Sequence, residues 1–420
     1  MKRNLHRMHR SCLHCALPLA AVFLLPSVAF AATNLPPPDA GQIGETAQQD
    51  ALQSRLPVTE GGAESAAFRL TRITVTQDGT KLNADELSRK AASYTERTIS
   101  EAELNALLTE LTTYARSHGY PAAAAYLPPQ TNAEGALTIR ILAGRYGKIT
   151  IDSSAAIDDG QIRRLAHALH TGAPIEGRRL EKALYNIAAL GGIEAAGLLS
   201  PGADFGTSDL TIRVRDGKRQ SFVLYSENYG SKSSGRYRYG AQHSIYNVDG
   251  MGSKVNVGAL ISNKSLHNYY VNYEALVGHG GTSLGIGYSR MDYEVSGPLK
   301  RLGAHGTADT ISVYGSRPVY HTTDEKLALT YGYDYRRLKD DMDAFGAQAA
   351  SEKHSHGIHA GVEGFWRDRK NGLSLNYNFV LTAGKVSADS WYAKRLAQSA
   401  GTDGGFTKAE AKVTAVQSLG

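Results

Sequence analysis

The chain has 420 residues, of which 20% are charged, and a formal net charge of +6. Four basic residues and no acidic residue lie in the first 31 residues, so the remainder carries 6 − 4 = +2, which argues against nucleic acid as a partner. Cys12 and Cys15 also lie in that stretch, and the rest of the chain can therefore form neither a disulfide nor a cysteine-based metal site.

Residues 1–31 have the pattern of a secretory signal peptide. Basic residues precede an apolar run from Ala16 to Phe30, and the small residue Ala31 marks the expected cleavage site. An uncleaved transmembrane anchor is the alternative. It is disfavoured because a span needs ~20 apolar residues and this run contains Pro18 and Pro26.

Residues 32–67 predict a linker, in which only Glu45 to Arg55 has a helical pattern. Two units of similar pattern follow, residues 68–145 and 146–218. Each of them predicts the order β-α-α-β-β, which indicates an internal repeat. We therefore expect two small α+β domains after the linker.

The first unit is the more clearly patterned, because Ser100 and Glu103 predict a capping box at the start of an amphipathic helix. Its expected elements are a strand from Leu70 to Val75, helices Asn83–Tyr94 and Ser100–His118, and strands Ala122–Leu127 and Leu137–Leu142. The second unit is expected to contain a strand Lys148–Ile151, helices Asp158–Ala168 and Gly177–Leu190, and strands Glu194–Leu198 and Leu210–Val214.

Residues 219–420 predict a meander of amphipathic strands. In the stretch from Leu327 to Tyr335, leucine and tyrosine alternate with small or polar residues, as expected for a strand between lipid and water. The expected segments number about ten and begin near residues 221, 235, 253, 267, 281, 306, 326, 354, 371 and 406. Tight even connections and long, polar odd ones, at Lys339–His354 and Gly384–Gly405, place the short turns on the periplasmic side.

Two enzyme-like patterns are better explained without catalysis. Gly281 to Gly285 matches Gly-x-Ser-x-Gly, but that elbow requires a helix behind the serine, whereas an alternating strand follows here. His354, His356 and His359 suggest a metal site, yet no carboxylate set lies at a ligand spacing, and a solvated loop end is favoured. We therefore predict no enzyme, no metal and no cofactor.

Three motifs carry a family resemblance: the joint Leu142–Gly147, the stretch Glu227–Arg238 at the start of the meander, and Gly119-Tyr120 followed by Ala125–Gln130. Together with the order of units, they make the chain resemble the transporters of two-partner secretion, the haemolysin secretion and activation family (ShlB, FhaC, HecB). The resemblance implies two periplasmic POTRA domains, residues 68–145 and 146–218, and an antiparallel transmembrane β-barrel from residue 219.

The chain departs from the family pattern in two respects. Family members resemble a sixteen-stranded barrel with a Val-Arg-Gly-Tyr loop, and neither the last strands nor that loop is present. The chain is therefore expected to be C-terminally truncated, with an incomplete barrel over residues 219–420 that ends at Leu419-Gly420. The family's plug helix has only residues 32–67 in which to lie.

By resemblance, the function is an outer-membrane pore that secretes an unfolded exoprotein such as a haemolysin or adhesin, with or without activating it. The implied partners are the secreted exoprotein, outer-membrane lipid and the barrel-assembly machinery. An outer-membrane protein assembly factor and a passive porin are the alternatives. The assembly factor normally carries more POTRA domains, and the porin does not explain the two periplasmic units.

The residues expected to contact the exported chain fall into two groups. Exposed strands of the POTRA sheets can pair with an unfolded chain by β-augmentation, and a polar lumen lets it slide. The expected edge residues are Ala122, Ala124, Tyr126, Glu194 and Leu198. The expected lumen residues are Arg236, Arg238, Asn268, Asn272, Glu274, His359 and Glu363.

Overall fold

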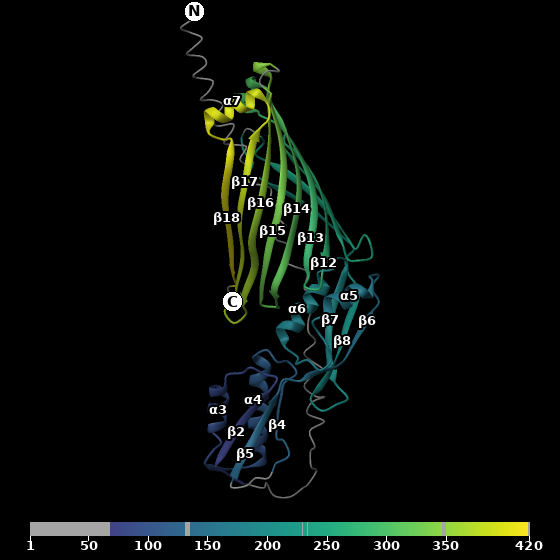
Figure 1. Ribbon diagram of the computed structural model, residues 1–420, viewed down its shortest axis with the longest axis vertical. Coiled ribbons are helices and arrows are strands. Elements are labelled where there is room, and N and C mark those ends of the chain that lie inside the picture. Colours follow the sequence, from purple (N-terminus) through teal and green to yellow (C-terminus); the bar gives the residue numbers. More distant parts are fainter. Residues whose placement is uncertain (1–67, 131–134, 229, 233, 347–349, 419–420) are drawn as a thin grey trace, which may run out of the picture.

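The computed structural model of the protein describes residues 68–130, 135–228, 230–232, 234–346 and 350–418. The predicted signal peptide and linker lie outside the described residues. Two small α/β modules stand one above the other, and a tall antiparallel sheet rises from the second module (Figure 1). The predicted fold class, β-α-α-β-β domains followed by an antiparallel sheet of about ten strands, is confirmed.

The first module has a three-stranded sheet in the order β2-β5-β4, with β2 parallel and β4 antiparallel to β5. Its elements are β1 (Phe68–Leu70), β2 (Arg72–Asp78), α3 (Ala84–Ala92), β3 (Arg97–Ile99), α4 (Glu101–Ser117), β4 (Ala124–Tyr126) and β5 (Ala136–Leu142). The single predicted opening strand is interrupted at Thr71, whose backbone N–H donates to the carbonyl of Gly135 at 2.9 Å. The part before the break, β1, pairs instead with β3, a strand that was not predicted.

Helix α4 forms where the sequence places it. The Ser100 hydroxyl accepts from the backbone N–H of Glu103 at 3.3 Å, and the Glu103 carboxylate accepts from the backbone N–H of Ser100 at 2.8 Å, so the capping box is present. Leu107 and Leu111 are fully buried against the sheet. The helix gives way to Gly119, whose φ of +95° is a conformation that glycine adopts without strain.

The second module repeats the arrangement, with sheet order β6-β8-β7 and β6 parallel to β8. Its elements are β6 (Arg145–Ser153), α5 (Asp159–Ala166), α6 (Gly177–Ala188), β7 (Ile193–Pro201) and β8 (Thr207–Asp216). Each strand is longer than predicted, because β6, β7 and β8 continue beyond the apolar positions that mark them in the sequence. Ile162, Leu180 and Ile187 form the centre of its core.

The ten strands of the tall sheet are paired in chain order, from β9 at one edge to β18 at the other. They are β9 (Gln220–Glu227), β10 (Arg238–Tyr246), β11 (Lys254–Ser262), β12 (His267–Val277), β13 (Thr282–Glu294), β14 (Ala304–His321), β15 (Glu325–Met342), β16 (Ser351–Asp368), β17 (Leu373–Ala388) and β18 (Gly404–Gln417). The predicted number of segments and their approximate starts are confirmed.

Short turns and long connections lie at opposite ends of the sheet. The even connections are tight and lie at the end next to the second module, as predicted (Figure 1). The far end carries η3 (Gly297–Leu302), η4 (Asp343–Phe345) and α7 (Trp391–Ala400). Strands continue into both of the long predicted loops, and α7 lies within the second. No helix in the described part of the chain has both the length and the apolarity needed to cross a bilayer.

Candidate functional site

The tall sheet has one polar and one apolar face. One row of paired residues crosses it from β10 to β18 and is polar, tyrosine or glycine: Tyr246, Lys254, Glu274, Gly285, Tyr314, Gly332, His359, Thr382 and Lys408. The neighbouring row points to the opposite face and is apolar: Val255, Tyr273, Ile286, Val313, Tyr333, Ile358 and Ala383. Successive residues of a strand alternate between faces, so each strand contributes to both.

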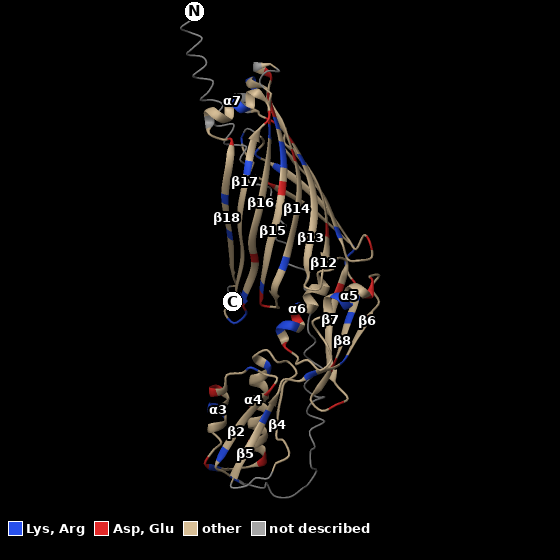
Figure 2. Ribbon diagram, in the orientation of Figure 1, with Lys and Arg blue, Asp and Glu red and all other residues tan. Residues whose placement is uncertain are grey.

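The apolar face is also the more exposed one. Ile286 is 53% exposed, Val313 50% and Ile358 64%. Figure 2 shows that Lys, Arg, Asp and Glu are sparse along strands β12 to β18. A broad exposed apolar belt opposite a polar face is the arrangement of a barrel wall between lipid and water, and we call the polar side the inner face.

Charged side chains on the inner face are paired across strands. The ion pairs are Arg238 with Glu227, Lys254 with Glu274 at 3.7 Å, and Lys326 with Glu363 at 3.2 Å. The ring of His359 contacts the carboxylate of Asp334 at 3.3 Å. Each pair joins neighbouring strands, where opposite charges stabilise the pairing. The inner face therefore offers hydrogen-bonding groups with little unbalanced charge.

Six of the seven predicted lumen residues share this inner face. Arg238, Glu274 and Glu363 belong to the ion pairs, and His359 contacts Asp334. Asn272 lies between Asn256 and Gly287, and it is only 4% exposed. Asn268, four residues away on the same strand, occupies the same face.

Arg236 lies outside the sheet, contrary to the predicted strand start near residue 235. Strand β10 begins at Arg238, and Arg236 belongs to the connection from β9, where its carbonyl accepts from the backbone N–H of Gly230 at 3.1 Å. Gly235 has a φ of +107°, which turns the chain just before the strand. Arg236 and Tyr237 precede the strand, so strand pairing does not place their side chains on opposite faces of the sheet.

The second module is docked on the turns at the near end of the sheet. Arg164 of α5 donates hydrogen bonds to the carbonyls of Gly278 and Leu276, the latter at 3.1 Å. The ring of His279 lies 4.9 Å from that of His167. These contacts fix α5 to the turn between β12 and β13.

Helix α6 contacts the next turn, between β14 and β15. The Glu181 carboxylate accepts from the backbone N–H of Thr323 at 2.8 Å. Tyr185 stacks on His321 with ring centroids 4.1 Å apart and an interplanar angle of 15°. Both contacts use backbone or ring atoms of the turn, so they fix the position of α6 against the sheet.

Two basic residues of α6 complete this contact. Lys182 donates from Nζ to the carbonyl of Val319 at 2.8 Å, and Arg178 forms an ion pair with Glu325 at 2.9 Å. Burial, together with the positive charge of nearby Arg317, lowers the pKa of Lys182. The lysine therefore loses solvation to make this contact.

Asn247 joins the turn between β10 and β11 to the same module. Its amide donates to the carbonyl of Ala156 at 2.7 Å, and its Oδ1 accepts from the backbone N–H of Gly252 at 2.9 Å. Asparagine tolerates the left-handed conformation that it adopts here, with a φ of +55°. The carbonyl of Gly252 in turn accepts from Gly191 of the module at 2.8 Å.

We call the contacts between the second module and the turns at the near end of the sheet the rim contacts. The residues that make them were not among the predicted site residues. One sequence signal marks them: Arg178, Glu181, Lys182 and Tyr185 lie at positions i, i+3, i+4 and i+7 of α6. That spacing puts large polar side chains on one helix face. A solvated face gives the same pattern, so the spacing alone does not identify a docking surface.

Strand β4 is an edge of the first module's described sheet and contains the predicted residues Ala124 and Tyr126. Ala122 precedes the strand, is 4% exposed and packs against Gly144 at the joint between modules. The predicted edge therefore begins two residues too early. The ring of Tyr126 meets that of Phe205 edge-on, with centroids 5.0 Å apart.

Strand β7 is the corresponding edge of the second module and pairs with β8 in the described sheet. Ala195 and Leu199 are buried in the core, so Glu194 and Leu198 lie on the opposite side of the strand. Glu194 is exposed and Leu198 is half-buried. Both modules thus place predicted residues on an edge strand of the described sheet, and at β4 the backbone N–H of Ala125 donates to the Thr112 hydroxyl of α4 at 2.9 Å.

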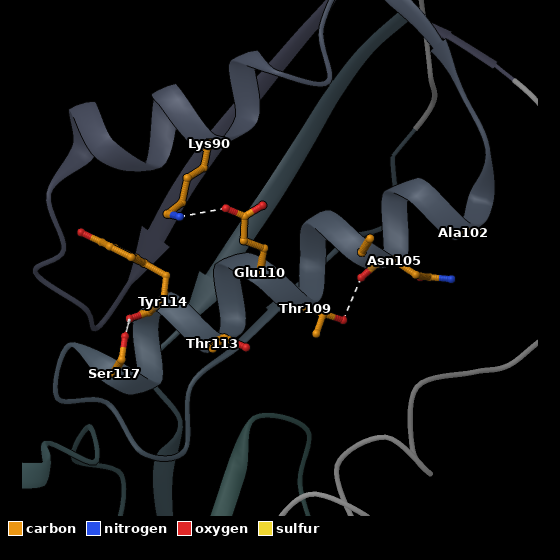
Figure 3. A pocket seen from close by; sticks show the side chains of 9 residues that line it. Lys90, Ala102, Asn105, Thr109, Glu110, Thr113, Tyr114 and Ser117 are labelled. Atoms are coloured by element: carbon orange, nitrogen blue, oxygen red, sulfur yellow. Dashed lines mark hydrogen bonds and ion pairs between the residues drawn. The ribbon is translucent and has the colours of Figure 1, made fainter. Parts of the chain in front are cut away.

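A groove of about 700 Å³ runs along the outward side of α4 in the first module (Figure 3). Lys90 of α3 reaches across it to Glu110 of α4, with Nζ and Oε1 2.8 Å apart. The remaining lining is small or polar: Ala102, Asn105, Ala106, Thr109, Thr113, Tyr114 and Ser117. The groove offers hydrogen-bonding side chains and one satisfied ion pair.

Two segments match known protein families. Residues 68–144 match the POTRA domain, ShlB-type. Residues 206–394 match the haemolysin secretion/activation protein ShlB/FhaC/HecB. The second match includes the last strand of the second module and most of the tall sheet.

Individual relatives agree with these matches. The heme/hemopexin transporter protein HuxB of Haemophilus influenzae is 27% identical over 369 residues, covering 83% of this chain and 65% of HuxB. The chain therefore spans slightly less than two thirds of the length of that relative. Similarity in sequence extends over both modules and the sheet.

Solved structures show the same fold. CdiB from Escherichia coli superposes with a TM-score of 0.57 at 22% identity, covering 82% of this chain and 65% of CdiB. CdiB from Acinetobacter baumannii gives a TM-score of 0.52 at 14% identity, covering 90% of this chain and 73% of that protein. The predicted family is confirmed over the matched segments: residues 68–144 and 206–394 carry the ShlB-type POTRA domain and the ShlB/FhaC/HecB domain of the haemolysin secretion/activation family, whose members are outer-membrane β-barrel transporters with POTRA domains in the periplasm.

Proposed function

We propose that the protein is the outer-membrane pore of a two-partner secretion system and exports an unfolded partner exoprotein. The tall sheet forms part of the pore wall, and the two modules are periplasmic POTRA domains that receive the exoprotein. Outer-membrane lipid surrounds the apolar belt, and the barrel-assembly machinery inserts the sheet. These roles follow from family membership and from the sidedness of the sheet.

The observation that carries the proposal is the paired charge on the inner face. An extended polypeptide presents backbone donors and acceptors along its whole length. A wall of asparagine, tyrosine and neutralised ion pairs can exchange hydrogen bonds with it at many equivalent places. Because few charges on the wall are unbalanced, no single position holds the chain tightly.

The edges of β4 and β7 are the proposed receiving sites. The edge of β7 offers backbone groups that an unfolded chain can pair with by β-augmentation. At β4 the incoming chain has to displace the hydroxyl of Thr112, which accepts from the backbone N–H of Ala125 at 2.9 Å. Tyr126 with Phe205 borders the first edge, and Glu194 borders the second. Main-chain pairing gives affinity with little dependence on the sequence of the cargo.

The protein shows no nucleotide site among its described residues, and the periplasm supplies no ATP. We therefore assign the driving force for export to folding of the exoprotein outside the cell. Folding there removes the extended form from the pore and prevents its return. A cargo kept unfolded outside should stall in the pore.

The test is a comparison of the culture medium of a deletion strain with that of the strain carrying the gene. We expect one large protein to disappear from the medium while the other outer-membrane proteins keep their levels. A general fall in barrel proteins would instead indicate an assembly factor. An unchanged medium together with lower permeability to small solutes would indicate a passive porin, and either result would refute the proposal.

Charge reversal on the inner face tests the pore itself. Arg238→Glu leaves two carboxylates, its own and that of Glu227, on neighbouring strands. We expect altered conductance in planar bilayers, because the local field in the lumen changes sign. Arg236→Glu is the matched control outside the sheet and should change conductance less. Equal effects of the two changes would remove Arg238 from the lumen wall.

A further inference from the structure

The apolar face ends in a group of cations at the far end of β15, β16 and β17. One outward-facing row of paired residues consists of Val271, Tyr288, Ile311, Tyr335, His356 and Lys385. The first four are apolar or aromatic and the last two are basic. Arg337 lies two residues beyond Tyr335 on the same face, opposite His354. We call Arg337, His356 and Lys385 the outer-rim patch.

The patch lies directly beyond the exposed apolar belt. Ile358 is 64% exposed and lies two residues from His356, and Leu381 is 56% exposed and lies four residues from Lys385. Tyr333 donates or accepts a hydrogen bond with Nδ1 of His356 at 2.6 Å. Aromatic residues followed by basic ones mark the level where a membrane changes from acyl chains to headgroups.

Nearby carboxylates leave part of this positive charge unneutralised. Glu352 lies between Arg337 at 3.6 Å and Lys339 at 3.1 Å, and Asp389 contacts His354 at 2.8 Å. Among the described residues, no carboxylate lies within ion-pair distance of Lys385. The lysine side chain is exposed and faces outward beside His356.

The neighbouring strands β13 and β14 differ at the same height. There Arg290 lies between Asp292 at 3.3 Å and Asp309 at 3.7 Å, so its charge is locally balanced. Asp309 is also opposite Arg337 in the sheet register and accepts from the Tyr288 hydroxyl at 2.7 Å. In the outer-rim patch, by contrast, Lys385 on β17 has no carboxylate partner among the described residues, while Arg337 on β15 shares Glu352 with Lys339.

We propose that the outer-rim patch binds a phosphate group of the phosphorylated glycolipid, lipid A, in the outer leaflet. Lys385 and Arg337 supply charge and N–H donors to the phosphate, and His356 supplies a ring nitrogen. The exposed side chains of Ile358 and Leu381, on the apolar belt next to the patch, contact the acyl chains. A free phosphate ion has no acyl chains and therefore cannot make these contacts. The inference rests on the proposed function in one respect: it requires that the apolar face of the sheet lies against membrane lipid.

Binding of lipid A to the purified full chain in detergent, followed by native mass spectrometry, tests the proposal. The probes are bisphosphorylated lipid A, the same lipid with its phosphates removed, and inorganic phosphate as competitor. We expect the bisphosphorylated lipid to bind in preference to the dephosphorylated one. Each lost cation should weaken binding about fivefold, the effect of a basic residue near an anionic lipid surface.

The variants are Lys385→Gln alone and combined with His356→Gln. Lys385→Arg keeps the charge and should bind as the unchanged protein does, which separates loss of charge from misfolding. Lys370→Gln is the matched control, because Lys370 is exposed on the turn at the other end of β16. It should leave lipid binding unchanged.

Three results would overturn the proposal: equal binding of dephosphorylated lipid A, undiminished binding by the double variant, or full competition by inorganic phosphate. The last would make the patch a site for free anions. Secretion of the exoprotein is measured separately in cells. Failure of lipid binding with normal secretion would refute this inference alone, whereas failure of secretion in the deletion test refutes the proposed function.

Discussion

The two modules have the same sheet topology, yet among the described residues only the second is joined to the tall sheet by a set of contacts with its turns. In the second module, α6 turns Glu181, Lys182 and Tyr185 toward a turn of the sheet. In the first, the outward side of α4 lines an open groove with Asn105 and Thr109. The difference lies in the outward helix faces, since the cores are built alike.

The first module joins the rest of the chain through a compact joint. Arg145 donates from Nη1 to the carbonyl of Gly172 at 2.9 Å and forms an ion pair with Asp78 at 3.2 Å. The backbone N–H of Gly177 donates to the carbonyl of Gly119 at 2.8 Å. The second module thus contacts the sheet directly, while the first is held to the second through this joint.

The largest expected effect comes from core truncation in one module at a time. Leu107→Ala and Leu180→Ala each remove a side chain that is at most 1% exposed, at a cost of about 2–5 kcal/mol. By hydrogen exchange, Leu107→Ala should loosen the first module and leave the turn at Gly278–Gly281 protected. Leu180→Ala should loosen that turn as well. Equal loosening of the turn by both variants would contradict the difference between the modules.

Loss of the α5 rim contact should have a smaller effect. Arg164→Gln removes the charged donor to Gly278 and Leu276, and we expect about 2 kcal/mol less stability of the docked arrangement. Spin-label distances between α5 and β12 should broaden. Arg163→Gln is the control on the same helix, because that side chain is 69% exposed and its ion pair with Asp159 contributes little. Similar broadening in the control would argue against docking through Arg164.

At the joint, Arg145→Gln tests the mobility of the first module. Loss of the bonds to Gly172 and Asp78 should cost about 1.5 kcal/mol and widen the distribution of distances between the two modules. Distances between the second module and the sheet should not change. Arg140→Gln, an exposed change on β5, serves as the control. A widened distance to the sheet would mean that the joint also supports the rim.

The fold was largely predictable because its signals are periodic. The alternation from Leu327 to Tyr335 and the stripe from Leu104 to Ala115 depend on local spacing, which the structure retains. Strand β3 was missed because three residues, Arg97 to Ile99, are too few to show a period. Ala122 was placed on an edge because its apolar neighbours continue the strand pattern, whereas the fold buries it at the joint.

For the site, the sequence predicts which face of the sheet a strand residue occupies, but not which residue it pairs with on the neighbouring strand. Asn268, Asn272 and Glu274 share a face because they are separated by even numbers of residues along one strand. The pairing of Glu274 with Lys254 depends on the register between strands, which no single strand determines. The rim escaped prediction for another reason: the acceptors of Arg164 are backbone carbonyls, and every residue has one.

The smallest expected effect compares helix caps in the two modules. Ser100→Ala should cost about 1 kcal/mol and raise exchange in the first turn of α4 only. Asp158→Ala should raise exchange at the start of α5 without releasing the second module, because its backbone N–H still donates to the carbonyl of Gly250. Release of the module would mean that the cap and the rim are coupled.

The cap of α4 should also respond to pH in a direction that the structure determines. The backbone N–H and hydroxyl of Ser100, followed by Arg97, lower the pKa of Glu103. A lowered pKa in the folded state means that the stabilisation is fully present above the unfolded value of about 4.3 and is lost as the pH falls through the folded value. Protection of the first turn of α4, corrected for intrinsic exchange rates, should therefore decline in acid in the unchanged protein. In Glu103→Gln the pH dependence of this protection should disappear. If the protection of the variant still declined in acid, another carboxylate would be responsible for the decline.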